Sequence, residues 1–268
     1  MRKNRTLMCL FVLCVALTIS SHCIAARQQP ASFPEAKAWL KKTSDYLGTL
    51  NRFQVHVQTS REIIYPRGGR IDDNAYGDVF VQRPNMLRVN VFRANKIREI
   101  YYNGTTLTVF SPKLNYYGEI AAPPTIDQML TMARRDYGIS LPATDLLRTN
   151  LYSKVAPQIT TGIVVGSSLL NGVYCKQLAF RSGTMDWQVW IENSSTPVPI
   201  QIVIVDRGVK GNPRYTARFT EWNTNPTFDT SMFTFTPPQG ALKIRFVKPS
   251  QVVRAQNSRG GQSCPTCR

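Results

Sequence analysis

The stretch Gly77–Glu119, GDVFVQRPNMLRVNVFRANKIREIYYNGTTLTVFSPKLNYYGE, decides the fold class of this 268-residue chain. Apolar and polar residues alternate along it, as at Leu87, Val89 and Val91, and a period of two is typical of strands with one buried face. Four turn signals interrupt the alternation, and Asn103–Gly104 is the clearest because both residues tolerate positive φ. The stretch therefore predicts five consecutive antiparallel strands joined by short hairpins.

Similar strand patterns flank this stretch on both sides. A long strand is expected over Phe53–Tyr65, followed by a polar turn over Pro66–Asp73. Five later strands are expected at residues 159–169, 173–180, 185–192, 200–205 and 214–222. These segments predict a mainly β, α+β fold: a single curved antiparallel sheet of roughly ten or eleven strands with a few covering helices. A sheet of this size must close or be covered, so its concave face encloses either a packed core or a ligand cavity.

The first covering helix is expected near the start of the mature chain. Ser32–Glu35 reads as a capping box, because the Ser32 hydroxyl can accept a hydrogen bond from the Glu35 amide. Apolar residues then recur at helical spacing from Ala36 to Leu50, which gives one apolar stripe. This helix is expected to lie on the sheet.

Two further helices are expected between the two runs of strands. Thr125 and Gln128 make a second capping box, and Gly138 ends the helix that follows. A short third helix is expected at residues 141–147. The second helix is rich in methionine, whose adaptable side chain suits a lid over varied ligands. Ordinary packing of helices on a sheet accounts for the same periodicity equally well.

Residues 1–26 have the composition of a secretory signal peptide. The n-region is basic, residues 7–19 form an apolar run too short for a comfortable membrane span, and Ala25–Ala26 offers a cleavage site. An uncleaved anchor is the alternative, whereas lipidation at Cys23 is disfavoured because the preceding His22 is bulky. We expect cleavage near Ala26 and a soluble mature protein.

The charge of the chain is strongly basic. Loss of the three basic residues of the signal lowers the formal charge from +17 to +14. Such a charge fits nucleic acid, anionic lipid or an acidic partner, and equally a solvated basic surface. The basic residues are scattered singly over the strands rather than massed with aromatic residues in one segment, so no nucleic acid partner is expected.

Residues that carry catalysis are sparse. His56 is the only histidine left after cleavage, which argues against nucleophilic triads and histidine-based metal sites. Asp72 and Asp73 are adjacent on an expected turn, so their carboxylates point apart and make a poor acid–base pair. We therefore expect no enzyme, no cofactor and no metal site.

Three cysteines remain after cleavage. Cys175 lies in a strand pattern and is expected to be a buried, small apolar residue. Cys264 and Cys267 form a CxxC motif in a basic tail, residues 248–268, that is expected to be disordered. A redox site needs a helix N-terminus to lower the pKa of the thiol, and none is expected there, so a local disulfide or a metal-scavenging tail is favoured.

Three segments resemble the LolA/LolB family of periplasmic lipoprotein carriers and acceptors: GDVFVQRPNML at 77–87, NGTTLTVFSP at 103–112 and FTFTPPQG at 233–240. They occur in the family's order, and the resemblance covers most of the mature chain. It implies an unclosed half β-barrel over residues 27–247, lid helices, an apolar cavity for acyl chains and a periplasmic location in a Gram-negative-like envelope. The loop at 66–73, the basic charge and the cysteine-containing tail depart from the family's pattern, so the chain looks more like an uncharacterised branch.

The resemblance also implies a lid latch at Arg83, whose fork of donors can satisfy several lid carbonyls at once. An exposed charge at a strand end is the plainer interpretation of this arginine. The candidate cavity and lid residues share one face of the expected strands and of the second helix: Leu87, Val89, Val91, Leu107, Val109, Met129, Leu130, Met132, Trp187 and Val189. A register error of one residue would invert the strand positions.

The expected function is that of an exported monomeric binding protein that holds a lipid, an acyl chain or another apolar ligand. A membrane lipoprotein or another envelope protein is the candidate partner. The alternative is an envelope interaction or stress-sensing module of the same fold, with no transported ligand and a cavity filled by its own side chains.

Overall fold

The computed structural model describes residues 33–65, 67–94, 96–139 and 148–248. The expected capping serine at position 32, the expected helix at 141–147 and the CxxC motif lie outside these residues. In chain order the elements are α1 (Phe33–Thr49), β1 (Arg52–Ile64), β2 (Arg70–Gln82), β3 (Met86–Arg93), β4 (Lys96–Tyr102), β5 (Thr106–Ser111), β6 (Tyr116–Ala121), α2 (Ile126–Tyr137), α3 (Leu151–Val155), η2 (Ala156–Gln158), β7 (Ile159–Leu170), β8 (Val173–Ser182), β9 (Met185–Glu192), β10 (Pro199–Asp206), β11 (Arg214–Asn223), η3 (Thr230–Phe233) and β12 (Leu242–Lys243).

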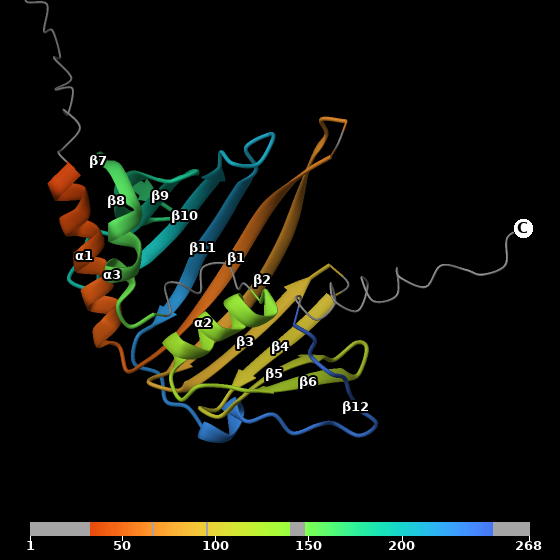
Figure 1. Cartoon of the computed structure of the whole chain (residues 1–268). Helices are drawn as coiled ribbons and strands as arrows, with labels where there is room; N and C mark the ends of the chain where they lie inside the picture. Colours follow the sequence, from red (N-terminus) through yellow and green to blue (C-terminus); the bar gives the residue numbers. More distant parts are fainter. Residues whose placement is uncertain (1–32, 66, 95, 140–147, 249–268) are drawn as a thin grey trace, which may run out of the picture.

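One curved sheet of twelve strands dominates the molecule, and helices α1 and α2 lie on its concave face (Figure 1). The strand order is β12-β6-β5-β4-β3-β2-β1-β11-β10-β9-β8-β7, so β12 and β7 are the two edges and the sheet does not close. All pairs are antiparallel except β12 with β6. The predicted mainly β fold with an unclosed sheet is confirmed.

The five predicted central strands are β2 to β6, and their turns follow the expected chemistry. In the β4–β5 turn Gly104 has a φ of 93°, and the Asn103 side chain accepts hydrogen bonds from the Thr105 and Thr106 amides at 3.2 and 3.0 Å. The short polar side chain thus replaces the ladder partners that the turn lacks.

The sheet differs from the prediction at two places. The expected polar turn over Pro66–Asp73 is shorter, because β2 begins at Arg70 and pairs with β1 up to Ile64. Side chains near this hairpin tip are exposed on both faces, so no alternation marks the strand. The other difference is β12, whose two residues are too few to produce a pattern.

Helix α1 covers the half of the concave face that β7 to β9 form, as Figure 1 shows. Ala36 and Leu40 of its apolar stripe pack in a buried cluster with Val164, Leu178 and neighbouring residues. The short α3 lies beside α1, and its Tyr152 amide donates to the Ser44 hydroxyl at 2.9 Å. The expected packing of the first helix on the sheet is confirmed.

Helix α2 covers part of the other half of the concave face. The Thr125 hydroxyl caps it by accepting from the Gln128 amide at 3.3 Å, and Gly138 ends it with a φ of 65°. Ile126, Met129, Leu130 and Ala133 form its buried side. Both helix limits and the apolar face agree with the sequence pattern.

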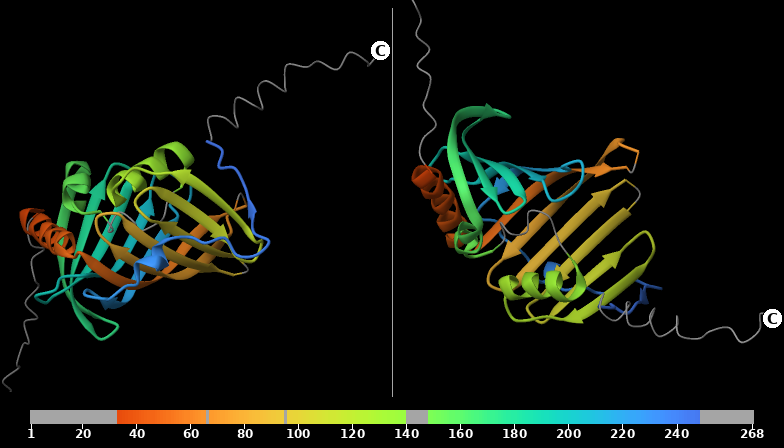
Figure 2. Two further views of the ribbon diagram at one scale, coloured as in Figure 1. Left: turned by 90° about the horizontal axis from the view of Figure 1, so that it is seen from below. Right: turned by 45° about the horizontal axis from the view of Figure 1, so that its top comes forward.

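The C-terminal segment, residues 224–248, wraps around the sheet, and we call it the strap. On the convex face its Phe235 contacts Tyr101, Phe110 and Tyr117, with ring centroids 5.1–5.3 Å apart. The strap then passes the β6 edge as β12 and returns to the concave face, a path visible in the left view of Figure 2. Among the described residues, no helix is long and apolar enough to span a lipid bilayer.

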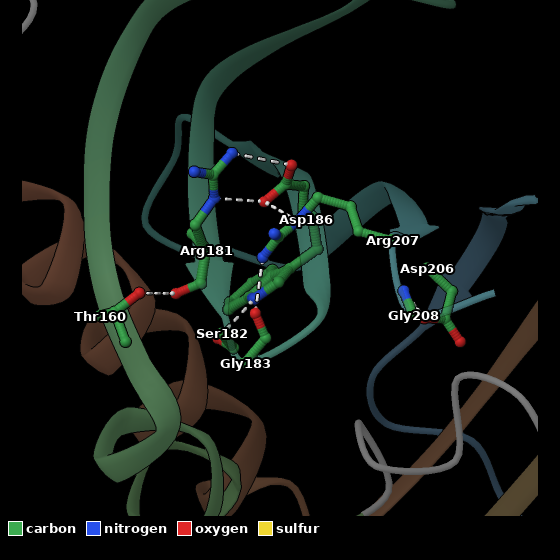
Figure 3. Close-up of polar contacts among 9 residues, drawn as sticks. Thr160, Arg181, Ser182, Gly183, Asp186, Asp206, Arg207 and Gly208 are labelled. Carbon is green, nitrogen blue, oxygen red and sulfur yellow. Dashed lines mark hydrogen bonds and ion pairs between the residues drawn. The ribbon is translucent and has the colours of Figure 1, made fainter. Parts of the chain in front are cut away.

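A polar cluster joins the β8–β9 hairpin to the turn that follows β10 (Figure 3). Arg181 donates to both oxygens of Asp186 at 2.7 and 3.1 Å, and Arg207 lies 3.1 Å from the same carboxylate. Arg207 also donates to the Gly183 carbonyl at 2.6 Å. The hydrogen bond with Arg181 lowers the pKa of Asp186. Because these charged groups bind one another, the cluster is structural.

Candidate ligand-binding cavity

A cavity of about 660 Å³ lies on the concave face between the central strands, the end of α2 and the end of the strap. Its volume falls in the range of roughly 300–1,000 Å³ that is usual for ligand pockets. The floor is formed mainly by apolar side chains of β1 to β5 and β11: Phe53, Val55, Val57, Val79, Val89, Val91, Ile100, Val109, Phe219 and Trp222. The fold thus places an apolar floor below a broad opening.

Strand β1 shows how the floor changes along its length. Its inward positions run from Phe53, Val55 and Val57 through Thr59 to Arg61. The first two of these side chains are buried and Arg61 is exposed. Alternation in the strand therefore produces an apolar deep end and a polar mouth.

The strap forms one wall of the cavity through Ile244 and Phe246. Phe246 lies against Gly118 of β6, where an added Cβ would come 2.5 Å from its ring. It also makes an edge contact with Tyr137 at the end of α2, with 6.0 Å between ring centroids. Gly118 therefore gives Phe246 room to reach the concave face, and Phe246 joins the strap to α2.

The mouth of the cavity is lined by four cations: Arg61, Arg93, Lys96 and Arg98. Arg93 pairs with Asp73 at 3.0 Å. No other carboxylate of the described residues is paired with these four cations. The mouth therefore carries a net positive charge.

Tyr215 of β11 also lines the mouth, directly across from Arg61 in the register of β1 and β11. Its hydroxyl is buried and has no hydrogen-bond partner among the described residues. Burial raises the pKa of Tyr215, and the charges of Arg61 and Arg93 oppose that rise. The hydroxyl therefore stays protonated at neutral pH and is available as a donor.

Arg83 lies between β2 and β3 and joins three segments. Its Nε donates to the Leu50 carbonyl at 3.1 Å and its Nη1 to the Thr149 hydroxyl at 3.0 Å, whereas Nη2 is buried without a partner among the described residues. Desolvation lowers the pKa of Arg83, and the nearby Asp127 opposes that effect. Asp127 itself accepts from the Thr149 amide at 3.2 Å. Arg83 thus connects the end of α1 to the segment that follows α2.

Of the ten residues that the sequence assigned to the cavity and lid, three line the cavity and five lie in the adjoining core beneath α2. Val89, Val91 and Val109 line it. Four others are buried in the core between α2 and the sheet: Leu87, Leu107, Met129 and Leu130. Met132 packs against that core.

Trp187 and Val189 are placed elsewhere. They lie in the cluster beneath α1 and are not lining residues in the part of the chain that the structure describes. The register aligns Val189 with Ile202 and Ile202 with Ala217. Ala217 lies on the same face of β11 as the lining residue Phe219, so Val189 points to the concave face, as expected. Alternation identifies a face of a strand, but it does not tell which helix covers it.

Several lining residues were missed by the sequence analysis. Phe53, Val55 and Val57 alternate clearly in β1, and extending the site to this strand would have found them. Phe246 has no comparable signal, because the strap lacks periodicity around it. Its role depends on the path of the strap around the sheet edge.

His56 and Cys175 both lie in strands and outside the cavity lining. His56 Nδ1 lies 2.9 Å from Asp78 Oδ1 on β2. Cys175 is fully buried, and desolvation raises the pKa of its thiol. The prediction that Cys175 is a buried apolar residue is confirmed. Within the described ranges, no group of three or more potential metal ligands is found.

Comparisons with solved structures find proteins of low sequence identity. The chain is similar to lipoprotein LppX of Mycobacterium tuberculosis, with 13% identity, a TM-score of 0.47, and coverage of 74% of this chain and 100% of that one. An uncharacterized conserved protein from Thermus thermophilus gives 13% identity and 0.47, covering 79% and 99%. A LolA superfamily protein from Nitrosomonas europaea gives 15% and 0.39, covering 75% and 97%.

Comparison with curated proteins finds no match. A family model described as "Predicted periplasmic protein (DUF2092)" matches residues 36–247. That range runs from α1 to the end of the strap and includes every lining residue of the cavity. The chain therefore belongs to this family of predicted periplasmic proteins.

Proposed function

We propose that this chain is a periplasmic binding protein that holds a lipid, an acyl chain or another apolar ligand in the cavity. The observation that carries the proposal is the apolar floor of a cavity of about 660 Å³. Each methylene that a chain buries there contributes about 0.8 kcal/mol. A ligand with a long hydrocarbon chain therefore gains most from this surface.

The shape of the cavity supports binding over the alternative of an interaction or stress-sensing module. In that alternative the protein's own side chains fill the concave face, as they do beneath α1. Over β1 to β5 the inward valines instead border open volume. The motifs that resemble the LolA/LolB family add support for a carrier role, with a membrane lipoprotein or another envelope protein as the recipient.

We place the lid at α2, with Arg83 as its latch. The hydrogen bond from Arg83 to Thr149 supports this assignment, because the Thr149 amide in turn donates to Asp127 of α2. Release of a ligand then requires the lid to exchange its own contacts for those of the ligand. Export through a signal peptide cleaved near Ala26 completes the proposal, and the carrier acts as a monomer.

The test is mass spectrometry of organic extracts from mature protein that is purified from the periplasm without detergent. We expect one lipid or acyl species at near one per protein, and a smaller amount in Val57→Trp, which narrows the cavity. Gln58→Trp is the matched control, because Gln58 is the next residue of β1 and is not a lining residue. Extracts without any such species, from protein that also refuses fluorescent acyl probes, would overturn the proposal.

A further inference from the structure

We infer that the mouth of the cavity is a subsite for an anionic headgroup, a carboxylate or a phosphate, on a chain-bearing amphiphile. Arg61 and the hydroxyl of Tyr215, which lie across from each other on β1 and β11, are the groups that recognise it, and Arg98 of β4 adds positive charge to the same mouth. The inference rests on the proposed function, and it adds the chemical class of the ligand.

The first argument is the arrangement of charge along the floor. On β4 the inward residues run from Ile100 at the deep end to Arg98 and Lys96 at the mouth. The same change occurs on β1 toward Arg61 and on β3 from Val91 to Arg93. Strands β1, β3 and β4 thus become cationic at the same end, and β2, which lies between β1 and β3, carries Asp73 there. An amphiphile with its chain on the valines would place its headgroup at these side chains.

The second argument is that most of this charge is not neutralised by the protein. Asp73 pairs with Arg93 and leaves Arg61, Lys96 and Arg98 without an ion pair among the described residues. Other exposed arginines of the sheet, such as Arg70 and Arg181, are bound to carboxylates. An anionic headgroup would supply the missing acceptors, and arginine binds carboxylate and phosphate in a bidentate manner.

The third argument is the hydroxyl of Tyr215. A buried polar group without a partner lowers the stability of a protein, so its presence requires an explanation. The described residues contain four such side-chain atoms, of Thr43, Arg83, Ser168 and Tyr215, and Tyr215 is the one that lines the cavity. A headgroup oxygen beside Arg61 would accept the hydrogen bond that this hydroxyl lacks.

The test compares ligands that share a chain and differ in the headgroup: palmitate, palmitoyl lysophosphatidate and hexadecanol. Each displaces the neutral probe N-phenyl-1-naphthylamine from the mature protein at low salt. We expect the anions to bind about tenfold more tightly than the alcohol, and added salt to reduce that ratio because the mouth is exposed to solvent. The tighter of the two anions identifies the headgroup as carboxylate or phosphate.

Variants separate the headgroup contacts from the apolar ones. Arg61→Gln with Arg98→Gln is expected to bring the anions down to the affinity of hexadecanol and to leave hexadecanol unchanged. The control is Lys154→Gln with Lys210→Gln, which removes the same charge from exposed positions outside the cavity and the lid. That control is expected to bind all three ligands as the original protein does.

Tyr215→Phe distinguishes recognition from a structural role. We expect weaker binding of the anions with an unchanged or higher melting temperature, because the substitution removes an unsatisfied buried hydroxyl. Equal affinity for all three ligands, with no effect of the arginine variants, would overturn the headgroup subsite and leave the apolar binding intact. Failure of all three ligands to bind would overturn both proposals.

Discussion

At the scale of single residues, Arg83 has the most consequential contacts of the described side chains. It holds the carbonyl of Leu50 at the end of α1 and the hydroxyl of Thr149 after α2. One side chain from the sheet therefore fixes two segments that lie far apart in sequence. The resemblance to the carrier family predicts a role of this kind, whereas periodicity alone does not.

We expect Arg83→Leu to lower the free energy of unfolding by about 1–3 kcal/mol, because two charge-assisted hydrogen bonds are lost. The loss is reduced because the substitution also removes the desolvated guanidinium. Bound N-phenyl-1-naphthylamine is expected to leave faster. Urea unfolding and stopped-flow release measure the two effects, and Arg83→Lys, which keeps the charge without the fork, should recover part of each. Unchanged stability and release in both variants would contradict the latch.

Tyr101 and Tyr102 predict a specific alkaline instability. Burial raises the pKa of each hydroxyl from 10.0 to about 12. The Tyr101 hydroxyl donates to Glu99 and that of Tyr102 to the Pro123 carbonyl. Between pH 10 and pH 12 the unfolded chain loses these protons while the folded chain keeps them, so stability falls as the pH rises through this window.

The measurement is the urea midpoint at about pH 9 and about pH 11 for the original protein and for Tyr102→Phe. Because the variant has one such group fewer, its midpoint is expected to fall less between the two pH values. Trp222→Phe, which removes an indole and no titrating group, is the control. An identical fall in Tyr102→Phe and the original protein would show that the Tyr102 hydroxyl does not contribute.

At the scale of elements, the strap carries out two tasks on opposite faces of the sheet. Phe235 packs among aromatic rings on the convex face, and Phe246 forms a cavity wall on the concave face. The short parallel pairing of β12 with β6 directs the chain around the edge. The strap therefore links the stability of the sheet to the shape of the cavity.

Phe246→Ala is expected to widen the cavity and to weaken the contact between the strap and α2. Because Phe246 is only partly buried, we expect a loss of about 1–2 kcal/mol in the free energy of unfolding, below the full cost for a buried phenylalanine. Probe association should become faster. Val247→Ala, at the exposed neighbouring position, serves as the control for both measurements. Equal effects of the two substitutions would show that Phe246 is not a wall.

Elements with a strong period could be predicted from the sequence, and elements without one could not. The alternation in β3 and the 3.6-residue spacing in α2 define a buried face because each element packs along its whole length. The strap, which includes β12, contacts the sheet over only a few residues at a time, so no hydrophobic period develops in its sequence. The position of Trp187 beneath α1 could not be predicted for another reason, because its surroundings depend on where α1 packs.

At the scale of the whole molecule, one concave face has two different uses. Over β7 to β9 it is sealed by α1 into a packed core, and over β1 to β5 it borders the cavity. The unclosed sheet permits this division, because its two halves meet different helices. The central claim is that the open half binds a hydrocarbon chain.

The most direct measurement is binding of N-phenyl-1-naphthylamine to Val57→Trp and Gln58→Trp, two substitutions at adjacent positions of β1. Val57 lines the cavity, whereas Gln58 is exposed and is not a lining residue. With melting temperatures confirming that both variants fold, we expect Val57→Trp to bind the probe more weakly, because the indole takes up part of the cavity above the apolar floor. Gln58→Trp should bind as the original protein does. Equal binding by the two folded variants would contradict the account.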